Sequence, residues 1–143
     1  MHPVARMLQQ VLEGWDIPTP SGTLRVKEED AMRLVPGSPY SVATNLAHAC
    51  RWQRLWLGNL GLGPRQDWHQ VCREDFREPQ QGEWAACRKE FVDGLQAAYD
   101  LARERGDELD EKALDTLMKI AIHATYHLGQ CNALRKLEKA TRG

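Results

Sequence analysis

Apolar residues recur at intervals of three and four residues along most of this chain, which is the spacing of one helical face. No segment alternates apolar and polar residues as a half-buried strand would. Long helices are therefore expected at about residues 4–15, 41–60, 82–106 and 111–139, with a shorter helical piece at 27–35. Residues 61–78 contain two glycines, a proline and few periodic apolar positions, so a loop is expected there.

The ends of these segments carry the residues that usually start and stop helices. Gly14 and Gly106 follow two of the apolar patterns, as C-terminal glycines do. Asp110 precedes the last pattern and is a favourable N-cap. The sequence thus predicts an all-α fold. We expect a single domain over residues 1–143, a four-helix bundle in up-down-down-up order or similar, with one long connection.

Composition narrows the possible partners. The 143 residues include 19 basic and 20 acidic side chains, well mixed along the chain, for a formal net charge of −1. A nucleic-acid surface would normally show a basic excess, so no nucleic-acid partner is expected. Neither a membrane-spanning run nor a signal peptide is recognisable, and we expect a soluble, cytoplasmic protein without a membrane partner. The four cysteines form no C-x-x-C pair, and no structural disulfide is expected.

Histidines are the candidate chemical groups. His123 and His127 lie four residues apart in the stretch IAIHATYHLGQ, so both rings leave the same side of the last helix, at the edge of its apolar arc. His48 lies among apolar residues of the second long helix, where an unsatisfied ring would be costly. Histidines at such positions either bind a shared metal ion or hydrogen-bond within the core, and the pattern alone allows both interpretations.

The number of ligands decides what kind of metal site would form. Three neutral histidines leave a coordination position open for water or substrate, which is typical of catalytic zinc. The metal would then lower the pKa of bound water or hold a thiol as its thiolate. Cys131, four residues after His127, is an alternative fourth ligand that would close the site into a structural one. A buried free cysteine is the ordinary alternative.

The motif H-x-x-x-H-L-G-Q, together with LVPGSPYSVATNLAH around the first histidine, resembles the DinB/YfiT-like superfamily over nearly the whole chain. The resemblance implies a four-helix bundle that binds a divalent metal ion, most often zinc or nickel. The implied ligands are His48, His123 and His127. Many members are homodimers, and the characterised enzymes include thiol-dependent transferases and isomerases that use low-molecular-weight thiols.

Neighbouring residues are candidates for supporting or lining this site. Gln130 and Gly129 match the motif, and from their residue types we expect a supporting hydrogen bond from Gln130 and a close helix contact at Gly129. Asn45 and Trp52 share the helical side of His48, and Trp52 would either pack in the core or wall a pocket. Relatives often have an acidic residue shortly after the first histidine. This chain has Arg51, Gln53 and Arg54 there, which leaves no carboxylate on that helix to act as a general base.

These observations predict a metal-dependent enzyme of the DinB superfamily that acts on a small molecule. The expected activity is that of a hydrolase or, as the resemblance alone implies, a thiol-dependent S-transferase, with zinc or nickel as cofactor and, for the transferase, a low-molecular-weight thiol as cosubstrate. The alternative is a non-catalytic, dimeric helical domain for stress response or small-ligand binding. In that alternative the histidine site is structural or empty.

Overall fold

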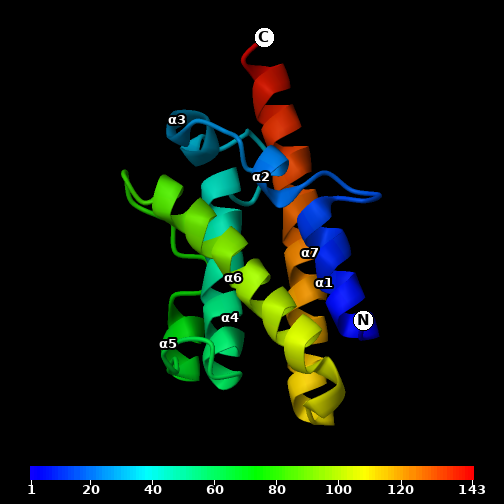
Figure 1. Cartoon of the computed structure of the whole chain (residues 1–143). Coiled ribbons are helices and arrows are strands. Elements are labelled where there is room, and N and C mark those ends of the chain that lie inside the picture. The colour runs from blue at the N-terminus through cyan, green and yellow to red at the C-terminus, as the bar shows by residue number, and fades with distance from the viewer.

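The computed structural model describes all 143 residues and contains helices but no strand, which confirms the all-helical prediction. Four of the helices are long, and the others lie in the connections between them (Figure 1). In chain order the elements are α1 (Pro3–Glu13), α2 (Pro20–Thr23), α3 (Glu28–Met32), α4 (Val42–Asn59), α5 (Trp68–Arg73), α6 (Trp84–Arg105), the 3-10 turn η1 (Gly106–Glu108) and α7 (Glu111–Thr141).

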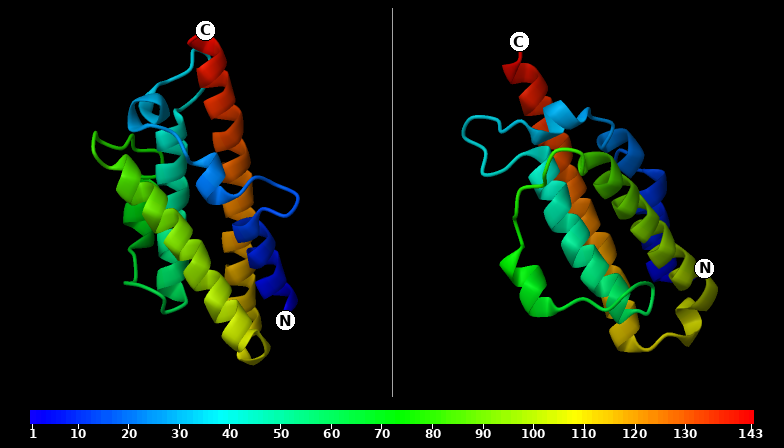
Figure 2. Two further views of the ribbon diagram at one scale, coloured as in Figure 1. Left: turned by 45° about the horizontal axis from the view of Figure 1, so that its top comes forward. Right: turned by 90° about the vertical axis from the view of Figure 1, so that its left-hand side faces the viewer.

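The long helices run in two directions. In Figure 1, α1 and α7 ascend, whereas α4 and α6 descend. Because α4 and α6 are parallel, the chain between them, residues 60–83, must return along the length of α4, and it carries α5 on the way (Figure 2). Both figures show α4 and α7 side by side, and this pair of helices supplies the candidate site.

Side chains cap the starts of the two helices that matter for the site. Ser41 precedes α4 in an extended conformation, and its Oγ accepts a hydrogen bond from the Thr44 amide at 3.1 Å. Asp110 does the same for α7, accepting from the Ala113 amide at 2.8 Å. These caps fix where each helix begins, and therefore which side chains of α4 and α7 face one another.

The core lies where the long helices meet, and its positions follow the predicted apolar arcs. The arc of α7 is buried at Leu117, Ala121, Ala124 and Leu128. Buried residues of α1, α4 and α6 pack against this arc in one continuous cluster. The histidines therefore stand beside a dry, well-filled core, which restricts how far their rings can move.

The connections contain two short helices that the sequence pattern did not predict. Residues 61–78 were expected to form a loop, but α5 occupies part of them and begins where the Asp67 side chain accepts from the His69 amide at 3.0 Å. α2 follows Thr19, whose Oγ1 accepts from Gly22. α5 has only Val71 buried and α2 is a single turn, so neither produces a periodic apolar signal.

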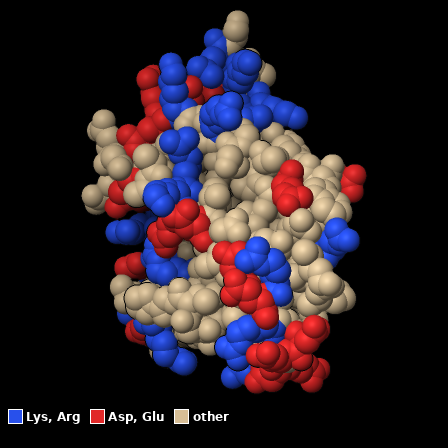
Figure 3. All heavy atoms as spheres, in the orientation of Figure 1, with Lys and Arg blue, Asp and Glu red and all other residues tan.

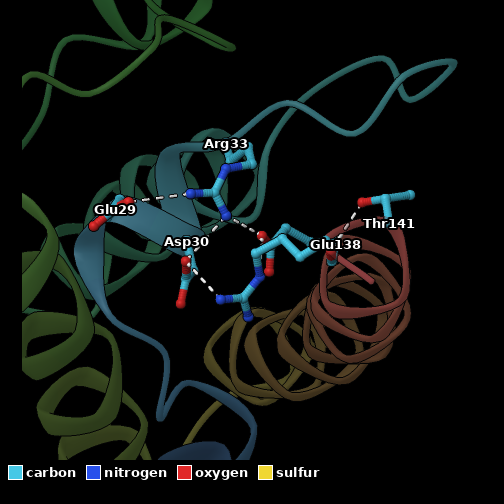
Figure 4. A network of polar contacts seen from close by, with 6 residues as sticks. Glu29, Asp30, Arg33, Glu138 and Thr141 are labelled. Carbon is cyan, nitrogen blue, oxygen red and sulfur yellow. Dashed lines mark hydrogen bonds and ion pairs between the residues drawn. The ribbon is translucent and has the colours of Figure 1, made fainter.

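A buried carboxylate ties α3 to the end of α7. The Glu138 side chain is 3% exposed and forms ion pairs with Arg33 and with Arg142, the latter at 2.8 Å. Both arginines also contact Asp30 of α3, so two acids and two bases alternate around one small cluster (Figure 4). This cluster holds the α3 segment, which leads into α4, against α7.

Replacing Glu138 with glutamine is expected to lower the melting temperature by several degrees. The amide keeps the shape of the side chain but leaves Arg33 and Arg142 close together with only Asp30 between them. Thermal unfolding followed by circular dichroism measures the change, and Glu104→Gln, at an exposed acid of α6, is the matched control. Equal melting temperatures for the two variants would contradict a stabilising role for the cluster.

Charge is less evenly spread in space than along the chain. Figure 3 shows acids and bases intermixed over most of one face, with basic side chains gathered toward the C-terminal end of α7. Arg25, Lys27, Lys136 and Lys139 line a hollow of about 580 Å³ at this end, beside the Glu138 cluster. None of the helices combines the length and the apolar content needed to cross a bilayer.

Candidate metal centre

His48 of α4 and His123 and His127 of α7 meet on the facing sides of these two helices. One ring nitrogen from each lies within 4.8 Å of the others, a grouping that could hold a metal ion. The ring centroids are 4.3 Å apart for His123 and His127 and 4.5 Å apart for His48 and His127. Two nitrogens on one zinc ion lie at most about 4 Å apart, because each Zn–N bond is about 2.0–2.1 Å. Small side-chain rotations would therefore bring the rings onto a common ion.

Asn45 sets the orientation and the tautomer of His127. The Asn45 amide nitrogen donates to the His127 carbonyl oxygen at 3.1 Å, which identifies the other end of the amide as the oxygen. That oxygen lies 2.8 Å from His127 Nδ1 and can only accept, so Nδ1 carries the proton. The lone pair of His127 is consequently on Nε2, where a metal ion would need it. Asn45 is completely buried, so these hydrogen bonds have no competition from water.

Asp75 orients His48 in the same way. Its Oδ1 lies 2.6 Å from His48 Nδ1 and accepts from Trp52 Nε1, also at 2.6 Å. A carboxylate that accepts both hydrogen bonds places the proton of His48 on Nδ1 and leaves Nε2 as the potential ligand atom. Carboxylate–histidine pairs of this kind fix ring orientation and raise ligand basicity in metal sites. The Trp52 side chain thus supports the site through Asp75 and does not merely fill the core.

Asp75 was not recognisable as a site residue from the sequence. The expectation was that no carboxylate of the second long helix would serve the site, and the structure places the carboxylate on the connection after α5 instead. Arg51 anchors this connection by donating to the carbonyl oxygens of Asp75 and Arg77 at 2.9 and 3.1 Å. Phe76 then stacks on the His48 ring, with centroids 4.0 Å apart and planes 8° apart. Only the path of the chain through space brings these groups to His48.

The surroundings keep two of the rings neutral. Burial and, to a smaller extent, the neighbouring His127 and His48 together lower the pKa of His123 to about 3. Burial, followed by the charge of His48, lowers the pKa of His127 to about 4. The edge of the Trp56 ring packs against His123 with centroids 4.8 Å apart, which adds to the apolar wall. Neutral imidazole is the form that binds metal ions.

These lowered pKa values predict a loss of stability in mild acid. Unfolded histidines have a pKa near 6.5, so below that pH the unfolded chain binds more protons than the folded one. The free energy of unfolding should fall as the pH falls from about 6.5 toward the folded values of about 3 and 4. In chelator-treated protein we expect the melting temperature to be several degrees lower at about pH 5.5 than at about pH 7.5.

The control for this pH dependence is His123→Ala, in which one of the two titrating groups is gone and the dependence should weaken. His69→Ala should leave it unchanged, because His69 is exposed on α5. A melting temperature that is the same at both pH values in the unsubstituted protein would contradict the assignment.

The other residues singled out from the sequence lie outside the histidine group. Cys131 is completely buried, its sulfur lies 3.3 Å from the Asn45 amide nitrogen, and it is not part of the histidine group. Burial raises the pKa of its thiol to about 12. Gln130 contacts the His127 ring, and this contact raises the pKa of that ring against the effect of burial, although the Gln130 Oε1 atom makes no close hydrogen bond. Gly129 is exposed with open space around its Cα, so the expected close helix contact is absent.

A hollow of about 570 Å³ opens beside the half-buried His123. Trp56 of α4 and Met118, Ile122 and Tyr126 of α7 form its largely apolar lining. Lys119 stands at its edge with Nζ 5.8 Å from the centre of the Trp56 ring. The histidine group is thus buried on one side by the core and is reached on the other through a surface that suits an apolar molecule.

Comparison with models of known protein families, with curated proteins and with solved structures found no match to this chain. The resemblance to the DinB superfamily therefore rests on the sequence motif alone. Function must be argued from the geometry of the histidine group and its neighbours.

Proposed function

We propose that this protein is a metal-dependent enzyme whose divalent ion, zinc or nickel, is held by His48, His123 and His127. The observation that carries the proposal is the pair of oriented rings. Asp75 and Asn45 each occupy an Nδ1 atom, which leaves Nε2 of His48 and of His127 available beside His123. A histidine that only forms hydrogen bonds within the core needs no other histidine beside it. The convergence of three rings therefore favours a shared metal ion.

The donor set fits a divalent ion of this type. Imidazole nitrogen suits zinc and nickel, and three neutral ligands leave at least one coordination position for a substrate. Bound there, such an ion supplies Lewis acidity that activates water or a thiol. The chain itself contributes the orientation of the rings, an environment that favours neutral imidazole, and aromatic contacts of Phe76 with His48 and of Trp56 with His123.

Asp75 is the proposed proton acceptor of the site, because its carboxylate contacts one of the proposed ligands directly. Its carboxylate shares Oδ1 between His48 and Trp52 and is about one third exposed, at 35% of the side chain. Because it is in contact with solvent, this carboxylate would pass on to water a proton that it takes up from a substrate. This supplies the base that was missing from α4.

We propose that the substrate binds in the hollow beside His123. Its apolar wall of Trp56, Ile122 and Tyr126 favours a small molecule with an apolar body. Lys119 and Asp115 also line the hollow and offer one charge of each sign to the polar end of the same molecule. A thiol-dependent S-transferase or a hydrolase acting on such a molecule is the activity these features favour.

The arrangement of the helices also supports a metal site between α4 and α7. We interpret α1, α4, α6 and α7 as a four-helix bundle in up-down-down-up order, with the connection through α5 as its long crossover. Bundles commonly build metal sites from side chains on facing helices, as α4 and α7 would here. The homodimer expected from the sequence motif stays a prediction, which sedimentation of the untagged protein tests.

Turnover by metal-loaded and chelator-treated protein tests the proposed activity. Zinc- or nickel-loaded protein should transfer a low-molecular-weight thiol to an electrophile, or hydrolyse an activated ester. Chelation or His123→Ala should remove this activity, whereas His69→Ala should keep it. Metal binding without turnover on any thiol, electrophile or ester would contradict the enzyme and favour the non-catalytic helical domain.

A further inference from the structure

Two cysteines on neighbouring helices lie side by side away from the histidine group. Cys50 of α4 and Cys87 of α6 have their sulfur atoms 3.4 Å apart. Both are free thiols in the structure. A disulfide bond is about 2.05 Å long, so side-chain rotation and a small approach would join the two sulfurs. No other pair of cysteine thiols in the chain is in contact.

The helices that carry the two cysteines are held closely together at this point. One turn further along α4, the Gln53 amide nitrogen donates to the Phe91 carbonyl oxygen of α6 at 3.0 Å. Gly94 of α6 lies so close to Gln53 that a Cβ atom at this position would be 2.2 Å from the Gln53 amide nitrogen. The short sulfur–sulfur distance is therefore part of a tight helix contact.

A small oxidant can reach the pair. Cys50 and Cys87 line a hollow of about 320 Å³ on the surface between α4, α6 and the connection that carries Asp75. This volume is about ten times the roughly 30 Å³ that one water molecule occupies, and hydrogen peroxide is little larger. Cys87 is half-buried, whereas Cys50 is 3% exposed, so Cys87 is the sulfur that meets the oxidant first.

The contact with Cys50 itself favours reaction at Cys87. Arg51 and Arg54 line the same hollow, and Arg54 is paired with Glu90 at 2.6 Å. The interaction with the Cys50 thiol lowers the pKa of Cys87 in spite of burial and the negative charge of Glu90, with Arg51 and Arg54 acting in the same direction. More of its thiolate is therefore present at neutral pH than for an ordinary cysteine.

We propose that Cys50 and Cys87 form a peroxide-sensitive dithiol that closes into a reversible disulfide between α4 and α6. In the first step the Cys87 thiolate attacks one oxygen of hydrogen peroxide, the O–O bond breaks, and hydroxide leaves a sulfenic acid on Cys87. Cys50 then loses its proton and attacks the Cys87 sulfur. The S–S bond forms, the S–O bond breaks, and the departing hydroxide takes up a proton as water. In sum, two thiols and one peroxide give one disulfide and two water molecules.

This modification site does not depend on bound metal, but it lies close to the proposed centre. Cys50 is followed by Arg51, which holds the connection that carries Asp75. A disulfide at Cys50 would tie α4 to α6 next to that anchor. Thiol oxidation would then act on the same connection that orients His48, without changing any of the three histidines.

Peptide mapping of peroxide-treated, chelator-treated protein tests the proposal. Trypsin separates the four cysteines into the peptides 34–51, 66–73, 78–88 and 120–135, so each thiol can be followed by itself. Without reductant, peptides 34–51 and 78–88 should appear linked, two of the four thiols should be lost, and the intact mass should fall by about 2 Da. Reductant should restore both thiols.

Variants distinguish the dithiol from general oxidation. In Cys50→Ser, Cys87 lacks its partner and should accumulate sulfinic acid, with a mass gain of about 32 Da. Cys72→Ser, at the exposed cysteine of α5, should form the linked peptides as readily as the unsubstituted protein. The proposal is overturned if Cys72 is oxidised while Cys50 and Cys87 stay free, or if Cys87 of the unsubstituted protein accumulates sulfinic acid without a linked peptide. The mapping of the unsubstituted protein decides the matter even where a serine variant fails to fold.

Discussion

Replacing His123 with alanine is expected to lower the affinity of the protein for zinc or nickel by more than about 100-fold. Loss of a residue that only supports a ligand typically costs about 10–100-fold, and His123 would be a ligand itself. Two remaining histidines on α4 and α7 would not hold the ion at the concentrations that saturate the unsubstituted protein. Isothermal titration of chelator-treated protein measures the change.

His123 is the best choice for this test because its loss disturbs the fold least. Unlike the rings of His48 and His127, its ring makes no hydrogen bond to another side chain and packs against Trp56 and His127. Truncating His127 would leave the buried Asn45 oxygen without a partner, at a cost of about 1–3 kcal/mol, and would confuse loss of metal with loss of stability. His69→Ala is the matched control, since His69 is exposed on α5 and outside the group. Equal affinities for His123→Ala and His69→Ala would exclude His123 as a ligand.

Replacing Asp75 with alanine is expected to lower metal affinity by about 10–100-fold while leaving the chain folded. The carboxylate makes no side-chain hydrogen bond or ion pair other than those with His48 and Trp52. The backbone around it stays anchored, because Arg51 binds carbonyl oxygens that the substitution does not remove. Without the carboxylate, His48 is free to rotate and to carry its proton on either nitrogen, so less of it presents Nε2.

The Asp75→Asn variant separates the orientation of the His48 ring from the negative charge of the carboxylate. The amide oxygen can still accept from His48, so metal affinity should lie between that of the unsubstituted protein and that of Asp75→Ala. If Asp75 is also the proton acceptor of the reaction, turnover should fall further than affinity in this variant, since an amide cannot take up the proton. Glu78→Ala removes an exposed acid from the same connection and should change neither quantity. Equal metal affinities for Asp75→Ala and Glu78→Ala would contradict the proposal that Asp75 orients His48.

The three histidines were predictable because their positions depend on local structure. Helical spacing puts His123 and His127 on one side of α7, and the apolar arc shows which side faces the other helices. The buried position of His48 in α4 follows from the same kind of pattern. Even Asn45 was recognisable, because it precedes His48 by three residues and shares its side of the helix.

Asp75 and the Cys50–Cys87 contact could not be predicted in the same way. Asp75 reaches His48 from a connection with no apolar period, and it is one of several acids in that connection. Its place depends on Arg51 binding two carbonyl oxygens, a long-range contact that sequence spacing does not encode. The two cysteines meet only because α4 and α6 pack closely at Gly94. Neither feature is visible until the helices are packed.

Metal analysis of the untagged protein tests the central claim most directly. Mass spectrometry of the purified chain, without added metal or chelator, should find about one zinc or nickel ion per chain, as expected for a single three-histidine site. The His123→Ala protein should contain almost none, and the His69→Ala protein should match the unsubstituted one. Folded, unsubstituted protein that contains no divalent ion and binds neither added zinc nor added nickel would contradict the metal centre.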